Sequence, residues 1–471
     1  MATTFISHKS ITSLLFIFLI SVQTYGQETK TIVMIGSGYV GLVSGPGLAE
    51  IGNKVICADV DAHKIAMLKQ GKLPIYEPGL EKVIAQNVAA GRLSFTADVG
   101  KAIEKADVVF IAVGTPMGED GSADLSYVKA VAELIAQHLN SYKVICTKST
   151  VPVGTGAWIR SLLENHGIKP ELFDMVSNPE FLREGSAVDD FLKPDRVVIG
   201  TETEKAREIM YDIYKPMFDA GAPYVFTTVP SSEMIKYASN GFLAVKISYI
   251  NEIANLCDAT GADVKMVSKA MGLDKRICPY FLNPGPGFGG SCFPKDSQAL
   301  MHASEKYQVP LEVVKASLVT NALQKKVPFK KLCALIHNDL QGKTIAILGL
   351  AFKENTDDIR YSPSITVIKE LLECGAQIKT FDPQAMENMK AIFSPYRHAI
   401  TYCADAYTAC TGADAVMIMT EWDEFKTLDL QKIASLVDNK ILVDTRNIIN
   451  INTLKQLEFT FDTIGRSCMC A

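Results

Sequence analysis

Short runs of apolar, mostly β-branched residues recur along this chain, and each run is followed by glycine or polar residues. In the first half they cover residues 31–35, 54–58, 106–113 and 142–147, and one more run ends at Ser177. In the last third the runs are 343–350, 377–381, 415–419 and 441–443. Continuous apolar runs of this length, separated by longer segments, are typical of strands in a buried parallel sheet with helical connections. The pattern therefore predicts an α/β protein with two doubly wound units.

A long helix is predicted between the two units, over residues 232–258. Its apolar residues occupy most of the helical circumference, so we expect it to be buried. Lys236 and Asn240 are four residues apart and share one face of this helix. One alternative is that Lys236 is salt-bridged or extends toward solvent, as most lysines on buried helices do. The other is that it is a desolvated lysine whose ammonium points into a functional site.

A dinucleotide-binding pattern directly follows the first apolar run. It reads Gly36-Ser37-Gly38-Tyr39-Val40-Gly41, and the second run ends at Asp59, close to the expected offset. The glycines let a pyrophosphate approach a helix N-terminus, and the acid binds the ribose hydroxyls. Asp59 would repel a 2′-phosphate, so NAD is predicted rather than NADP. Pro46 lies inside the helix that should follow, which predicts a kink or a short first helix.

Polar residues at other strand ends mark further candidate positions, because ligands of such sheets bind at the carboxyl ends of the strands. In the first unit these are Thr115, Thr150 and the segment 177–185, although each is equally compatible with ordinary turn chemistry. In the last third, Lys353, Arg360 and Arg446 suit anionic phosphates, with plain surface charge as the alternative. The last unit has no GxGxxG, so a second dinucleotide is not expected.

One glycine- and proline-rich stretch, residues 281–296, contains a single cysteine: FLNPGPGFGGSCFPKD. Glycines permit close backbone approach to a ligand and prolines stiffen the path. If a helix begins near Pro294, Cys292 lies at its N-terminus, where the dipole favours a thiolate. The alternative is a surface loop with an inert buried cysteine.

Composition narrows the possible functions. With 471 residues the chain is too long for one core, and 48% hydrophobic with 21% charged residues is ordinary for a globular protein. A net charge of −5 gives no reason to expect nucleic acid as a partner. Eleven cysteines without a CxxC pair and seven scattered histidines predict no metal site, so acid–base chemistry must rely on Lys, Asp and Glu.

The N-terminus resembles a secretory signal peptide. Lys9 precedes an apolar run at 11–22, and Thr24 and Gly26 precede Gln27. The alternatives are a start codon placed too early or an unusual leader on a cytosolic enzyme. Free cysteines and a nicotinamide site favour the cytoplasm, so we predict a cytoplasmic protein, with export as the minority alternative.

With these residues in place, the chain from about residue 30 to about 466 resembles the UDP-glucose/GDP-mannose dehydrogenase family. The resemblance rests on GSGYVG, LPIYEPGL, GTPMGEDGSADL, TKSTVPVGT, SNPEFLREG, EMIKYASNGFLAVKISYINEIANLC, PGFGGSCFPKD and LGLAFKENTDDIR. It implies two Rossmann-like domains joined by a long central helix that also forms a homodimer. It implies the following ranges: a possible leader at 1–26, an NAD-binding domain at 30–225, a central dimerisation and catalytic region at 226–327, a UDP-sugar-binding domain at 328–466, and a tail at 467–471.

The resemblance also assigns roles by position. The implied catalytic residues are Cys292, Lys236, Asn240, Asp296, Glu180 and Thr150. The implied NAD contacts are Gly36, Gly38, Val40, Gly41, Asp59, Lys64, Thr115, Thr150, Glu184, Lys295 and Arg360. The implied substrate contacts are Glu180, Phe181, Leu182, Arg183, Glu184, Lys236, Asn240, Arg276, Phe281, Leu282, Asn283, Pro284, Gly285, Gly289, Lys353 and Arg446.

The implied reaction is oxidation of the C6 alcohol of UDP-glucose to the carboxylate of UDP-glucuronate with two NAD. The second oxidation requires a covalent thiohemiacetal on Cys292, which becomes a thioester and is hydrolysed. One alternative is a sister enzyme that acts on GDP-mannose or UDP-N-acetylmannosamine. Another is a binding protein that keeps the fold without the activity. The leader, Pro46-Gly47 and the C-terminal tail depart from the family pattern.

Overall fold

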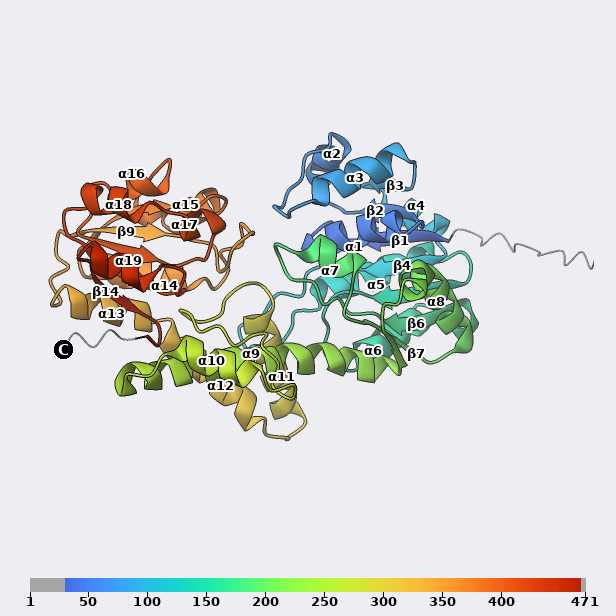
Figure 1. Ribbon diagram of the computed structural model, residues 1–471. Helices are drawn as coiled ribbons and strands as arrows, with labels where there is room; N and C mark the ends of the chain where they lie inside the picture. The colour runs from blue at the N-terminus through green and yellow to red at the C-terminus, as the bar shows by residue number, and fades with distance from the viewer. Residues whose placement is uncertain (1–29, 467–471) are drawn as a thin grey trace, which may run out of the picture.

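The computed structural model describes residues 30–466, and it contains two parallel-sheet units joined by a long helix (Figure 1). The predicted leader and tail lie outside these residues. Within 30–466, no helix is long and apolar enough to cross a membrane. The predicted fold class is confirmed, because each unit is a doubly wound α/β sheet.

The first sheet has eight strands in the order β3-β2-β1-β4-β5-β6-β7-β8. The strands are β1 (Thr31–Ile35), β2 (Lys54–Ala58), β3 (Leu93–Thr96), β4 (Val108–Ile111), β5 (Lys143–Thr147), β6 (Phe173–Ser177), β7 (Val197–Thr201) and β8 (Tyr224–Thr227). All neighbours are parallel except β6 and β7. The first six follow the order 3-2-1-4-5-6, which brings the ends of β1 and β4 together at the switch point of the sheet.

Helices cover both faces of this sheet. They are α1 (Tyr39–Glu50), α2 (Ala62–Lys69), α3 (Leu80–Ala89), α4 (Val99–Lys105), α5 (Ser126–His138), α6 (Thr155–Asn165), α7 (Ala187–Leu192) and α8 (Glu204–Asp219), with a 3-10 turn at Pro170–Leu172. Two separate apolar clusters, one on each face, form the core, as expected for a sheet that is buried on both sides.

The first helix is not shortened by its proline. α1 runs for 12 residues with Pro46 inside it. Of the two predicted outcomes, the short first helix is therefore wrong, and the kink stays a prediction. The glycines on either side of Pro46 explain how the helix is held. A Cβ on Gly45 would lie 2.5 Å from the sulfur of Cys57, and one on Gly47 would lie 2.3 Å from the ring of Phe191. Close packing against β2 and α7 therefore offsets the missing backbone hydrogen bond of the proline.

The central helix α9 (Val229–Thr260) has 32 residues and joins the two units. Thr228 caps its N-terminus by accepting a hydrogen bond from the Ser231 N–H, and Gly261 ends it in the left-handed conformation. Near its start, the Ser232 hydroxyl donates to the carbonyl of Ser177 at the end of β6. Farther along, the helix packs against α11 and α12, so it carries residues from the first sheet toward the second (Figure 1).

One face of α9 is exposed, contrary to the expectation of burial over most of its circumference. Phe242 is 64% exposed and Leu256 is 60% exposed, and Tyr249 lies halfway between them. Intervals of seven residues place these side chains on one stripe of the helix. Apolar periodicity cannot distinguish a face that packs within the chain from a face that packs on another chain.

The second sheet follows a group of helices formed by α10 (Val264–Gly272), α11 (Phe293–Lys306), α12 (Glu312–Gln324) and α13 (Val327–Leu335). Its six strands are parallel, in the order β11-β10-β9-β12-β13-β14. They are β9 (Thr344–Leu348), β10 (Gln377–Phe381), β11 (Ile400–Tyr402), β12 (Ala415–Ile418), β13 (Ile441–Asp444) and β14 (Thr460–Thr463). The covering helices are α14 (Pro363–Glu373), α15 (Met386–Ile392), α16 (Ala406–Cys410), α17 (Asp423–Lys426), α18 (Leu430–Leu436) and α19 (Ile451–Gln456), with a 3-10 turn at Ser394–Tyr396.

Candidate active site

The turn after β1 is shaped by its glycines. Gly36 has a φ of +105°, and a Cβ there would lie 2.6 Å from the carbonyl oxygen of Ala112. A Cβ on Gly41 would overlap the carbonyl oxygen of Gly36, so the helix can start this close to the turn only with glycine at both places. In front of Gly38 there is open space. This turn fits a pyrophosphate at the start of α1, and Val40 lies half-buried in its first turn.

Asp59 lies beside this turn. Its carboxylate accepts hydrogen bonds from the Ser37 N–H at 2.6 Å and the Asp61 N–H at 3.0 Å, and it pairs with Lys64 at 3.6 Å. Thr115 and Thr150, at the ends of neighbouring strands, also meet, because the Thr115 hydroxyl donates to the carbonyl of Thr150 at 2.9 Å. The structure thus places the predicted cofactor residues of the first unit along one edge of the sheet, and the residues present fit NAD.

A buried ion pair lies next to these strand ends. The Lys236 ammonium is 3.0 Å from a carboxylate oxygen of Glu180, and both side chains are almost fully buried. Burial lowers the pKa of Lys236, but Glu180, Cys292 and Asp296 outweigh burial and raise it. Burial raises the pKa of Glu180, but the attraction of Lys236, the Leu182 N–H and Lys148 together outweigh this effect and lower it. Lys236 is therefore a cation and Glu180 an anion at neutral pH.

The second polar group of the cluster is centred on Asp296, which is fully buried in the first turn of α11. The side-chain amide of Asn240 donates to one of its oxygens at 2.6 Å, and Lys295 pairs with the other. Asn240 and Lys236 share one face of α9, as the four-residue spacing predicted. This face carries the amide and the ammonium toward the start of α11.

Cys292 occupies the residue just before α11, so the predicted helix start is confirmed. Its sulfur lies 3.5 Å from the Ser291 hydroxyl. Burial nevertheless raises the pKa of the Cys292 thiol to about 11, with Glu180 and Asp296 adding to the rise and Lys236 opposing it. Burial therefore acts against the thiolate that the helix N-terminus is expected to favour.

The glycine-rich turn before Cys292 is packed between the two units. The Gly285 N–H donates to the Asn251 side chain at 2.8 Å, and its carbonyl accepts from the Gln324 side chain at 2.8 Å. Cβ atoms on Gly289 and Gly290 would collide with the carbonyl of Tyr361 and the ring of Phe352. Of the other predicted contacts, Phe281 has a φ of +60°, the Leu282 side chain is buried in an apolar cluster, Asn283 is exposed and Pro284 is buried.

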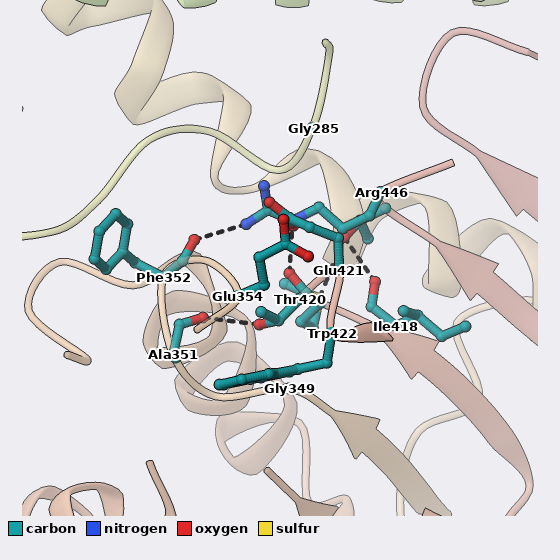
Figure 2. Close-up of polar contacts among 12 residues, drawn as sticks. Gly285, Gly349, Ala351, Phe352, Glu354, Ile418, Thr420, Glu421, Trp422 and Arg446 are labelled. Atoms are coloured by element: carbon teal, nitrogen blue, oxygen red, sulfur yellow. Dashed lines mark hydrogen bonds and ion pairs between the residues drawn. The ribbon is translucent and has the colours of Figure 1, made fainter. Parts of the chain in front are cut away.

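Arg446 lies just beyond β13 and faces the same turn, as Figure 2 shows. Its guanidinium donates to the carbonyls of Phe352 at 2.8 Å and Met419 at 2.9 Å, and it pairs with Glu421 at 2.8 Å. A Cβ on Gly285 would be 3.3 Å from this guanidinium. Burial lowers the pKa of the neighbouring Lys353, and Glu184 opposes this effect. The second unit thus places two cations beside the turn.

Glu184 connects all three parts of the site. Its carboxylate accepts hydrogen bonds from the Ser291 and Thr356 hydroxyls, each at 3.0 Å, and pairs with Arg360 at 3.6 Å. Burial raises the pKa of Glu184 to about 7, with the nearby Asp358 adding to the rise. Because Ser291 precedes Cys292 and Thr356 belongs to the second unit, Glu184 joins the first sheet to both.

Some predicted residues lie apart from this cluster. The only side-chain partner of Arg276 among residues 30–466 is Asp274, and Arg276 is 89% exposed. Arg183 pairs with Asp190 at the surface. Phe181 and Leu182, in contrast, adjoin the cluster. The ring centre of Phe181 is 3.6 Å from the Arg196 guanidinium and 5.3 Å from the Lys236 ammonium, and the Leu182 N–H donates to Glu180 at 2.5 Å. In the segment 180–184, the carboxylates of Glu180 and Glu184 therefore reach the site, whereas the Arg183 side chain does not.

Two buried charged residues were not singled out from the sequence. Glu77 accepts hydrogen bonds from the Tyr39 hydroxyl and from the N–H groups of Gly185 and Ala187, which ties the cofactor turn to the loop of Glu184. Lys148 is buried behind Glu180. The motifs LPIYEPGL and TKSTVPVGT contain these residues, but only the fold shows that their charges are buried. Within residues 30–466, no group of three or more His, Cys, Asp or Glu is placed to hold a metal ion.

Comparison with known proteins matches three successive segments of the chain to the domains of one family. Residues 30–218 match the NAD binding domain of the UDP-glucose/GDP-mannose dehydrogenase family, residues 230–322 its central domain, and residues 346–451 its UDP binding domain. The chain belongs to this family. The matched segments together include the dinucleotide turn, α9, Cys292 and the strand end that carries Arg446.

Two curated relatives are similar over nearly their whole length. A UDP-glucose 6-dehydrogenase of Rhizobium meliloti is 47% identical over 92% of this chain and 99% of the relative. A UDP-glucose 6-dehydrogenase of Bacillus subtilis is 46% identical over 93% of each. Among solved structures, a UDP-glucose dehydrogenase of Pyrobaculum islandicum has a TM-score of 0.86 at 37% identity, covering 94% of this chain and 99% of that one.

Proposed function

We propose that this chain oxidises UDP-glucose to UDP-glucuronate in two steps, with NAD as the cofactor and Cys292 as the nucleophile. The observation that carries this proposal is the buried cluster of Lys236, Asn240 and Asp296 around the start of α11, where Cys292 lies. Relatives at 47% and 46% identity are named UDP-glucose 6-dehydrogenases, which favours UDP-glucose over other nucleotide sugars.

In the first oxidation, the C6 hydroxyl gives its proton to a base, for which the ionised Glu180 is the candidate, and loses a hydride to become an aldehyde. The cationic Lys236 and the amide of Asn240 stabilise the negative charge that develops on this oxygen, and burial strengthens both interactions because water is excluded. NAD, when bound at the turn 36–41, accepts the hydride in each oxidation. Arg446 and Lys353 hold the diphosphate of the substrate from the second unit.

In the second oxidation, the sulfur of Cys292 adds to the aldehyde carbon to form a thiohemiacetal. Loss of a second hydride leaves a thioester, and water releases the carboxylate and returns the thiol. Asp296 and Glu180 are the candidates for activating this water, and Thr150 for positioning it. Since burial raises the pKa of Cys292 to about 11, the thiol is protonated until it reacts, and Asp296, one turn along α11, is the candidate for taking its proton.

An activity panel tests this proposal. The purified chain is mixed with NAD and, separately, with UDP-glucose, GDP-mannose and UDP-N-acetylmannosamine, and NADH is measured by absorbance. We expect two NADH per UDP-glucose consumed. Selective oxidation of another nucleotide sugar would support the sister-enzyme alternative, and absence of NADH with every sugar would support a binding protein.

Replacing Asp59 with alanine is expected to weaken NAD binding by about tenfold to hundredfold and to narrow its preference over NADP. A hydrogen bond to a charged group is worth about 1.5–3 kcal/mol, and the charge that repels a 2′-phosphate also disappears. Titration of both cofactors measures the effect. Asp61→Ala is the matched control, because Asp61 caps α2 two residues away and should affect stability without affecting the cofactor. If the wild type and Asp59→Ala bind NAD with equal affinity, Asp59 does not contact the cofactor.

The exposed stripe of α9, formed by Phe242, Tyr249 and Leu256, is proposed as the contact between two copies of the chain in a homodimer. The double variant Phe242→Glu/Leu256→Glu is expected to run as a monomer in size-exclusion chromatography with light scattering, because it places charge in an apolar contact. Ile392→Glu, an exposed apolar position on α15, is the control and should leave the mass unchanged. A monomeric wild type would contradict the proposed dimer.

The ranges 30–225, 226–327 and 328–466 are proposed as the three functional regions, and each contains one of the matched family segments. We also propose that the enzyme works in the cytoplasm, because both oxidations need a cofactor pool and a reduced cysteine. Cell fractionation tests this proposal. Recovery outside the cytoplasm of a processed protein that begins near Gln27 would overturn it.

A further inference from the structure

A second buried lysine lies behind the Lys236–Glu180 pair and has no part in the mechanism above. Lys148 directly follows β5 and is only 5% exposed. Its ammonium donates to the side-chain oxygen of Asn178 at 3.0 Å and lies 6.0 Å from the ring centre of Tyr214. No carboxylate of residues 30–466 forms an ion pair with it. A buried cation with one neutral partner is costly to keep.

The partner of Lys148 is itself fixed in place. Asn178 is fully buried, its N–H donates to the carbonyl of Thr147, and its side-chain amide donates to the carbonyl of Val198 at 2.8 Å. The Tyr214 hydroxyl donates to the same side-chain oxygen at 2.6 Å. These bonds settle the orientation of the amide, so its oxygen faces Lys148. Asn178 is two residues before Glu180, so the bond to Asn178 fixes the ammonium on the segment that leads to that carboxylate.

The charged and titratable groups that interact with Glu180 come from four places in the chain. They are Lys236 on α9, Lys148 after β5, Arg196 before β7 and the Cys292 thiol before α11. Burial raises the pKa of Glu180, but Lys236, the Leu182 N–H and, with a smaller effect, Lys148 together oppose burial, and the pKa falls below its ordinary value. Burial lowers the pKa of Lys148 to about 8, with Glu180 acting against this effect. At neutral pH, two buried ammonium groups therefore act on one carboxylate.

We propose that Lys148 is a positioning residue that acts through Glu180: anchored by Asn178, its charge keeps Glu180 ionised and paired with Lys236. The inference rests on the proposed function, in which the ionised form of Glu180 takes part in the reaction. This role accounts for a buried lysine that contacts neither the proposed NAD turn at 36–41 nor the turn before Cys292.

The test is the pH profile of kcat/KM for UDP-glucose in Lys148→Met and Lys148→Gln. Removal of a positive neighbour raises the pKa of Glu180, so the acid limb of the profile is expected to move to higher pH by about one unit. Both substitutions keep most of the length of the side chain, and they remove a charge that is costly to bury. Lys143→Met is the matched control. Lys143 is also buried, at the start of the same strand, and its ammonium donates to the carbonyl of Ala106 at 2.6 Å.

An acid limb that moves in both Lys148 variants and stays in place in Lys143→Met supports the proposal. An unmoved acid limb in the Lys148 variants, or an equal shift in the control, overturns it. If melting curves show that neither Lys148 variant folds, Asn178→Ala decides, because it keeps the charge and removes its anchor. We expect a smaller shift in the same direction, and an unmoved limb there also overturns the proposal. A wild-type protein that forms no NADH would instead contradict the proposed function.

Discussion

Replacing Cys292 with serine is expected to reduce steady-state NADH formation from UDP-glucose by about 10³-fold or more, as removal of other enzyme nucleophiles does. Serine preserves the volume but is a far poorer nucleophile, so the thiohemiacetal does not form at a useful rate. Ligand binding should persist, because the proposed contacts belong to the glycine turns, Arg446 and Lys353. The first oxidation does not need the thiol, so any residual product should be the aldehyde or a slowly hydrolysed ester. NADH release and mass spectrometry of the protein after mixing measure both.

Cys278→Ser is the matched control for this prediction. Cys278 lies in the same segment between α10 and α11, and we expect its replacement to leave turnover near that of the wild type. If Cys292→Ser forms UDP-glucuronate at a rate close to the wild type, the cysteine is structural and the covalent route proposed above is wrong.

Replacing Lys236 with methionine is expected to reduce kcat by about 10²–10³-fold and to destabilise the fold. The first effect follows because the cation that stabilises the developing oxyanion is lost. The second follows because Glu180 remains as a buried carboxylate without its ion-pair partner, and breaking a buried pair costs about 3–5 kcal/mol. Stopped-flow NADH formation and thermal unfolding measure the two effects separately.

The double variant Lys236→Met/Glu180→Gln distinguishes these effects. It removes both charges of the pair, so we expect the melting temperature to recover much of the loss while activity stays low. If activity recovers together with stability, Lys236 only supports the fold and has no role in the chemistry.

Much of the fold could be predicted from the periodicity of the sequence. Strands β1, β2 and β10 have the predicted bounds, because each is a compact apolar run between clear turn residues. The strands that were not predicted are β3, β7, β8, β11 and β14. β3, β8, β11 and β14 are short edge strands with exposed or partly exposed positions, so their apolar runs are broken. β7 is different, because it is a buried apolar run of five residues inside the sheet. The reversal of β7 relative to β6 comes from tertiary packing and leaves no local pattern.

The site could be predicted only as a set of residue types. The four-residue spacing placed Lys236 and Asn240 on one face of α9, and the prolines and glycines located the turn of Cys292. The roles by position came from the family resemblance, and they remain proposals. Two facts required the fold. The burial that raises the pKa of Cys292 cannot be predicted from its neighbours in sequence. The contact of Lys148 with Asn178 depends on the pairing of β5 with β6, which brings the ends of these two strands together.

The turn of Cys292 has a consequence for exchanging segments between relatives. By sequence it belongs to the middle of the chain, but its backbone is bonded to the last third, where the Gly290 N–H donates to the carbonyl of Arg360 at 2.7 Å. Gly289 and Gly290 also lack room for any side chain beside Tyr361 and Phe352. A chimera joined near residue 328 would combine a turn from one parent with the 352–361 surface of the other. Residues 281–296 and 351–361 therefore have to come from the same parent, and crossover points in a chimera should not separate them.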